Sequence, residues 1–221
     1  MKRELTAWPA VLGLCALVAC ELGEGDGNGG GPGLGPEQTV TVGSTATLDG
    51  WVRDNGDAGP TGSQVIAGDL LTSGVYRGYR GFYSFDITSI PTGSSVTSAN
   101  LRLYQLSFNG APYVELGNVI VESVDYGASL DPPDYGAAPL APAIGTLSNN
   151  TATEYKTLIV TGAVQADVAA ARTGAQFRLR FSNTDNNNDG SADNVTFTDV
   201  EWPVAANRPE LVVKYRPPAT P

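Results

Sequence analysis

The chain has 221 residues, with 13 Lys and Arg, 23 Asp and Glu, and a formal net charge of −10. That balance argues against a nucleic-acid-binding protein, because contacts with phosphate need clustered basic side chains. Histidine is absent and both cysteines lie near the N-terminus, which excludes a Ser-His-Asp triad, an imidazole-bound metal and a disulfide framework. With 27 glycines, 15 prolines and few charged residues, the composition favours one turn-rich, all-β domain.

The first residues predict export from the cytoplasm. Lys2 and Arg3 precede a mostly apolar stretch, residues 5–19, which is too short and too interrupted to span a bilayer permanently and is typical of a secretory signal. The sequence Leu17-Val18-Ala19-Cys20 resembles the bacterial lipobox. The resemblance implies that residues 1–19 are a lipoprotein signal peptide and that Cys20 is lipidated and becomes the new N-terminus. The alternative is an ordinary signal peptide that is cleaved nearby.

Residues 20–37 predict a lipidated cysteine followed by a Gly-rich tether. The run ELGEGDGNGGGPGLGP, residues 21–36, has too few apolar side chains to offset the entropy lost on ordering. Two acyl chains on Cys20 would give stable anchoring to a membrane. The resemblance to bacterial lipoproteins, in which an Asp after the cysteine marks retention in the inner membrane, implies the outer membrane or the cell surface, because Glu21 stands at this position. Residues 217–221 are expected to be a disordered tail, which leaves residues 38–216 as the folded domain.

Short alternating or apolar runs between turn residues predict about ten strands in this domain. The clearest run is 176–181, where Phe177, Leu179 and Phe181 alternate with polar side chains, as in a half-buried antiparallel strand. The pattern favours a single antiparallel β-sandwich that is jelly-roll-like. The expected strands are 39–42, 46–53, 64–67, 81–86, 99–107, 114–124, 155–160, 176–181, 195–198 and 210–215.

Two segments depart from the strand pattern. Residues 162–172 have helical spacing, with Val164, Val168 and Ala171 on one face and Gly174 just after the end, which predicts one short helix. Residues 127–145 contain four prolines and predict a long loop, either functional or a crossover between two sheets.

Three stretches resemble the bacterial DNRLRE-domain family of secreted β-sandwich modules. They are YRGFYSFDITSIP (residues 79–91), VTSANLRLY (96–104) and NRPELVVKY (207–215). The string of six letters that names the family is absent, as is a tryptophan-bearing segment in residues 127–145. The resemblance implies a non-catalytic β-sandwich, related to carbohydrate-binding modules, some of which bind polysaccharides such as alginate.

Two arginines, one just before the first stretch and one within it, allow two interpretations. Arg77 or Arg80 can pair with a carboxylate at the end of a strand, in a structural role, while Asp86 caps the following turn. Alternatively, Arg77 and Arg80 hold the carboxylate of a sugar in a bidentate manner.

Residues 185–194 carry the metal-like pattern of the sequence. Asp185, Asn187, Asp189 and Asp193 occupy positions 1, 3, 5 and 9 of a calcium-loop spacing, and Gly190 occupies position 6. This spacing lets alternate oxygens converge on calcium. Position 12 lacks Glu and no helices flank the segment, so a solvated turn is the alternative.

The sequence gives no sign of catalysis. No pair of carboxylates is marked by its spacing and no nucleophile accompanies a base, so we expect a protein that is not an enzyme. A binding module needs aromatic faces and a few polar groups, which makes Trp51, Tyr79 and Trp202 candidates beside Arg77 and Arg80. We therefore expect a lipid-anchored polysaccharide-binding domain; a structural or adhesive envelope protein and a polysaccharide-cleaving enzyme are the alternatives.

Overall fold

The computed structural model describes residues 33–59 and 64–219. The expected signal peptide, Cys20 and most of the expected tether lie outside these residues. Within the described part of the chain, no helix is long and apolar enough to cross a bilayer. The strands in this part of the chain are β1 (Gln38–Gly43), β2 (Gly50–Arg53), β3 (Ala58–Gly59), β4 (Gln64–Thr72), β5 (Val75–Asp86), β6 (Ser95–Asn109), β7 (Val119–Val124), β8 (Ala141–Ser148), β9 (Glu154–Ile159), β10 (Gly174–Phe181), β11 (Asn194–Thr198) and β12 (Glu210–Arg216).

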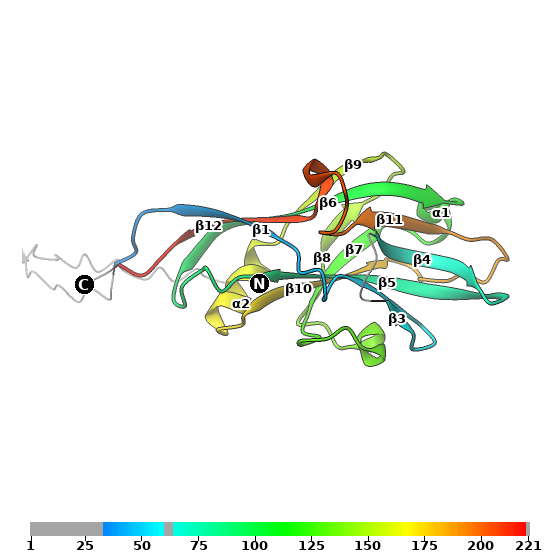
Figure 1. The fold of residues 1–221 in the computed structure, drawn as a ribbon, viewed down its shortest axis with the longest axis horizontal. Coiled ribbons are helices and arrows are strands. Elements are labelled where there is room, and N and C mark those ends of the chain that lie inside the picture. Colours follow the sequence, from blue (N-terminus) through cyan, green and yellow to red (C-terminus); the bar gives the residue numbers. More distant parts are fainter. Residues whose placement is uncertain (1–32, 60–63, 220–221) are drawn as a thin grey trace, which may run out of the picture. The chain divides into compact units, whose positions relative to one another are not determined.

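All strand pairings are antiparallel and connect into one sheet (Figure 1), in the order β1-β12-β6-β11-β4-β5-β10-β7-β8. Strand β9 pairs with β6, and β2 pairs with β3 and β5. Strand β4 pairs with the first part of β5, up to Tyr79, whereas β10 pairs with its last part, from Gly81 to Asp86. The sheet therefore divides at β5 into two halves, one reached through β4 and the other through β10.

The inner faces of the two halves share the main hydrophobic core. Buried side chains from β6, β11 and β12 form one cluster with those of β5, β7 and β10. Phe177, Leu179 and Phe181 of β10 are in this core, each at most 1% exposed, as their alternation predicted. The predicted all-β, antiparallel sandwich is thus confirmed.

The predicted short helix is confirmed as α2 (Thr161–Ala169). Val164 and Val168 are buried in the main core, but Ala171 is exposed, contrary to the helical spacing. The reason is that Ala171 has a φ of 53°, so the helix already ends in the left-handed conformation typical of a C-terminal cap. A one-turn helix, α1 (Pro112–Glu115), replaces the start of the strand expected at residues 114–124.

The proline-rich segment is not a crossover between sheets, because it joins β7 and β8, which are paired neighbours. We call the connection between them, residues 125–140, the strap. It contains a 3-10 turn, η1 (Pro132–Gly136); a second such turn is η2 (Ala205–Asn207). Tyr126 and Leu130 of the strap pack with Val52 of β2 and Phe82 of β5 in a second hydrophobic cluster, on the outer face of this half of the sheet.

The two ends of the domain pair with each other. Strand β1 pairs with β12 along its full length, from Gln38 opposite Tyr215 to Gly43 opposite Glu210, and the two strands run side by side in Figure 1. The pairing continues outward: Leu34 bridges Pro218, and the Gly35 N–H donates to the carbonyl of Pro217 at 2.8 Å. The last residues of the expected tether therefore contact the first residues of the expected tail.

Candidate functional site

The polar face of β10, opposite its core face, carries a group of charged side chains that is largely buried. Arg178 is 3% exposed and donates to Glu122 of β7 through Nε and Nη2, at 2.8 and 2.6 Å. Arg180 donates to the other oxygen of Glu122 at 2.9 Å. Burial opposes ionisation of Glu122, but hydrogen bonds from the two arginines prevail and lower its pKa. The predicted half-buried strand is thus more buried than its alternation indicated, because the strap covers Gln176 and Arg178.

The same side chains hold the strap in place. Arg178 Nη1 donates to three strap carbonyls, those of Asp134, Tyr135 and Ala137, at 2.8–3.1 Å. Gln176 Nε2 donates to the carbonyl of Gly127, and its Oε1 accepts from the N–H of Tyr126, both at 2.8 Å. These contacts satisfy backbone groups that would otherwise be buried without partners. Sequence analysis missed this role, since only the order of strands places Glu122 opposite Arg178.

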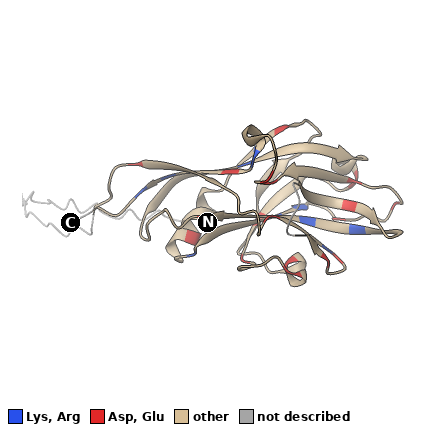
Figure 2. Cartoon of the chain, viewed as in Figure 1, with Lys and Arg blue, Asp and Glu red and all other residues tan. Residues whose placement is uncertain are grey.

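The two arginines proposed to bind a sugar carboxylate each contact a carboxylate of the protein. Arg80 donates to Asp185 at 2.8 Å and its guanidinium lies 4.2 Å from the centre of the Tyr135 ring. Arg77 lies 3.7 Å from Asp54. Arg80 and Asp185 line a polar cavity of about 410 Å³. Figure 2 shows basic residues along β5. The ion pairs of Arg77 and Arg80 with carboxylates of the protein agree with the structural interpretation of these arginines.

The predicted aromatic residues fall in separate places. Trp51 and Tyr79 contact edge to face, with ring centres 5.0 Å apart, and the Arg53 guanidinium lies 4.9 Å from the Trp51 ring centre. Tyr79 is 4% exposed. Trp202 lies between β11 and η2, where its carbonyl accepts from Arg208 at 2.8 Å. No aromatic contact or hydrogen bond among the described residues joins Trp202 to Trp51 or Tyr79.

The structure does not bring the four residues of the predicted calcium loop together around one point. Asp185 points toward Arg80: one of its carboxylate oxygens accepts a hydrogen bond from Arg80, and the other accepts one from the Phe181 N–H at 3.0 Å. Asn187 and Asp189 form exposed turns within the loop, and Asp193 is 2% exposed at the start of β11. In residues 33–59 and 64–219, no group of three or more acidic or cysteine side chains has an arrangement that could hold a metal ion.

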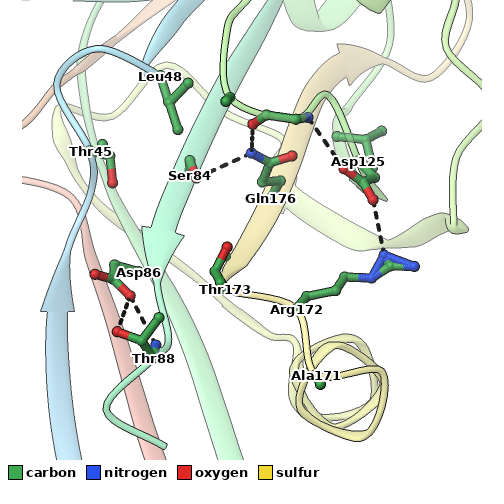
Figure 3. Close-up of a pocket in the computed structure, with 14 residues that line it drawn as sticks. Thr45, Leu48, Ser84, Asp86, Thr88, Asp125, Ala171, Arg172, Thr173 and Gln176 are labelled. Atoms are coloured by element: carbon green, nitrogen blue, oxygen red, sulfur yellow. Dashed lines mark hydrogen bonds and ion pairs between the residues drawn. The ribbon is translucent and has the colours of Figure 1, made fainter.

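A cleft of about 640 Å³ opens beside β5 and β10 (Figure 3). Its lining comes from segments far apart in the sequence: the β1–β2 connection, β5, the start of the strap and the turn between α2 and β10. Figure 3 shows the side chains of Thr45, Ser84, Thr173 and Gln176 around it. The complete lining is Thr45, Leu48, Ser84, Asp86, Thr88, Val124, Asp125, Gly127, Ala128, Ala171, Arg172, Thr173, Gly174 and Gln176.

Polar groups in this cleft are partly free. No hydrogen bond within the described residues engages the hydroxyls of Thr45 and Thr173, whereas one oxygen of Asp86 accepts from the hydroxyl and the N–H of Thr88, at 2.7 and 2.9 Å. These two bonds lower the pKa of Asp86, so it is a carboxylate at neutral pH.

One basic side chain lines the cleft, and it is held by two acids. Arg172 lies 3.2 Å from Asp125 and 3.4 Å from Asp167. Burial raises the pKa of Asp167 to about 6, against the opposing effect of the Arg172 charge. The cleft therefore presents hydroxyls and carboxylates, with no uncommitted cation in its described lining. Of the sequence-predicted site residues that the structure describes, none lines it, because the cleft is assembled by segments whose meeting depends on the fold.

Fold and site together define an all-β sandwich with an open, mildly acidic cleft. Comparison of the chain with protein-family models and with curated proteins finds no match.

Proposed function

We propose that this protein is a non-catalytic polysaccharide-binding module, held at the outer membrane or cell surface of a bacterium by a lipid anchor on Cys20. The observation that carries the proposal is the open cleft, whose lining includes the free hydroxyls of Thr45 and Thr173 and apolar surface from Leu48 and Ala128. Sugar rings offer hydroxyls on their edges and C–H groups on their faces, and such mixed linings suit them.

The charges favour a neutral polysaccharide. Asp86 and Asp125 are exposed at the cleft, Arg172 is already paired, and the chain has a net charge of −10. A polyanion would be repelled by this surface unless cations bridged it. Arg77 and Arg80, which would grip a sugar carboxylate, are engaged by Asp54 and Asp185.

The test is affinity electrophoresis of the full chain through gels that contain neutral or acidic polysaccharides. We expect retardation by at least one neutral polysaccharide. Replacing the exposed Ala128 by Trp places a bulky side chain in the cleft and should weaken binding about tenfold or more, which corresponds to about 1.4 kcal/mol. The matched control is Ala152→Trp, at an exposed alanine outside the cleft, which should bind as the natural protein does.

Three outcomes would contradict the proposal. Absence of retardation across the panel would favour a structural or adhesive role, which self-association at micromolar concentration would support. Equal binding by both variants would place the sugar elsewhere, with Trp51 as the next candidate. Release of reducing ends at catalytic protein concentrations would show a polysaccharide-cleaving enzyme.

A further inference from the structure

Two buried carboxylates meet where β4, the start of β11 and the turn before α1 come together, at the end of the sandwich that carries the α1 label in Figure 1. Asp69 of β4 is 0% exposed and Asp193, just before β11, is 2% exposed. The two residues are locked together: the Asp69 N–H donates to the carbonyl of Asp193, and the Asp193 N–H donates to Oδ1 of Asp69, both at 2.8 Å. Oδ1 of Asp193 accepts from the N–H of Ala111 at 2.5 Å.

Each of these carboxylates has one oxygen without a partner. Oδ2 of Asp69 and Oδ2 of Asp193 are both buried and accept no hydrogen bond from the described residues. Neither side chain takes part in an ion pair among those residues, although eight arginine and lysine side chains pair with other carboxylates there. Two buried carboxylates without a compensating positive charge are strongly unfavourable.

The surroundings add negative charge. Burial raises the pKa of Asp69, and the charges of Asp193 and Asp189 raise it further, against the opposing effect of the backbone N–H groups of Asp193 and Asn187. Asp189 lies on the exposed loop that leads into Asp193, and Asn188 and Gly190 on either side of it have φ of 56° and 88°. A cation bound by Asp69 and Asp193 would relieve both the missing partners and the repulsion.

We propose that Asp69 and Asp193 bind one calcium ion through their free Oδ2 atoms, with Asp189 contributing its charge from the loop and water completing the coordination shell. Calcium fits because it takes six to eight oxygen ligands in irregular geometry, whereas magnesium demands a near-ideal octahedron. This ligand set differs from the spacing-based one: Asp69, far away in the sequence, replaces Asp185, whose oxygens are engaged by Arg80 and Phe181.

The test compares thermal unfolding of the full chain in EDTA, in calcium chloride and in magnesium chloride. With calcium about 100-fold above the Kd, we expect Tm to rise by about 5–10 °C, and magnesium to give a smaller rise. Asp69→Asn should abolish the calcium effect. In EDTA this variant should unfold at or above the temperature of the natural protein, because the amide removes one of two repelling charges. Asp57→Asn makes the same change of charge at an exposed loop residue and should keep the full calcium effect.

Isothermal titration of the natural protein with calcium gives a second measurement that does not depend on the folding of a variant, with one ion per chain expected. The same Tm in EDTA and calcium, or a calcium effect that survives in Asp69→Asn, would overturn the proposal. Loss of the effect in Asp189→Asn alone would place the ion on the exposed loop instead. A Tm that rises on acidification without any response to calcium would show that a proton holds the two carboxylates.

Discussion

Asp49, in the turn between β1 and β2, is a carboxylic acid that the fold keeps away from water. Asp49 is 2% exposed. It accepts one hydrogen bond from the hydroxyl of Ser44 and another from the Ser84 N–H at 3.3 Å. Burial raises its pKa from 3.8 to about 8, although these hydrogen bonds oppose the rise, and the charge of Asp199 adds to it. Asp49 is therefore largely protonated in the folded chain at neutral pH, whereas it is ionised in the unfolded chain.

This difference predicts that the protein loses stability as pH rises. Between the ordinary pKa of 3.8 and the folded pKa of about 8, the folded state holds a proton that the unfolded state has released. The free energy of unfolding should then fall with pH by up to about 1.4 kcal/mol per pH unit. Asp49→Asn removes the titrating group and keeps an oxygen acceptor, so the variant should show a shallower slope in urea unfolding across this range. Parallel slopes for the two proteins would contradict the assignment.

At the scale of elements, the strap depends on Arg178. Arg178→Ala would leave the buried carboxylate of Glu122 with Arg180 alone and would remove the donor of three strap carbonyls. Removing one partner of a buried ion pair costs about 3–5 kcal/mol, and we expect a loss of this size in urea unfolding. Amide hydrogen exchange at residues 134–137 should also become faster in the variant.

Arg77→Ala is the matched control for this prediction. It breaks the ion pair with Asp54, in which the two side chains are 35% and 30% exposed, and such pairs contribute about 0–1 kcal/mol. If both variants lost equal stability, or if the strap exchanged at its normal rate without Arg178, the strap would be held by its apolar contacts instead.

The sequence predicted those elements whose pattern reflects a single buried face. Strand β10 and helix α2 were recognisable because Phe177, Leu179, Val164 and Val168 recur at the period of their element. Strand β8 was missed because Pro142 lies within it. The proline is tolerated because β8 is at the edge of the sheet and pairs with β7 alone. The burial of Arg178 was also missed, because the local alternation of a strand carries no information about a loop that folds over its polar face.

The same limit applies to the sites. Spacing brought Asp185 and Asp193 into one predicted loop, but Asp185 contacts Arg80 and Asp193 contacts Asp69, which is 124 residues away. The cleft likewise joins segments from four regions of the chain. Its residues have no shared pattern in the sequence, and only the strand order brings them together.

For the whole molecule, the prediction concerns how the domain is attached to the cell. Lipidation of Cys20 should give a mature protein whose N-terminal peptide carries acyl chains in mass spectrometry and which enters the detergent phase on phase separation. Cys20→Ser should remove the acyl mass and keep the protein in the aqueous phase, because two acyl chains are needed for stable anchoring.

The other cysteine provides the control. Cys15→Ser changes the same residue type within the expected signal peptide and should leave the acyl mass unchanged. A natural protein without acyl groups, or one that partitions like the Cys20→Ser variant, would show that the signal is an ordinary one and that Cys20 is not modified.

The pairing of β1 with β12 determines how the sandwich resists a pull on its N-terminal side. Six residue pairs join the two strands in register, and residues 33–37 precede β1 in the chain. Tension along β1 would shear the ladder and load its hydrogen bonds together, whereas a perpendicular force would break them one after another. If the lipid anchor and the polysaccharide binding proposed above are correct, a pull between membrane and polymer would load β1 along its length, which is the mechanically stronger direction for a pair of strands.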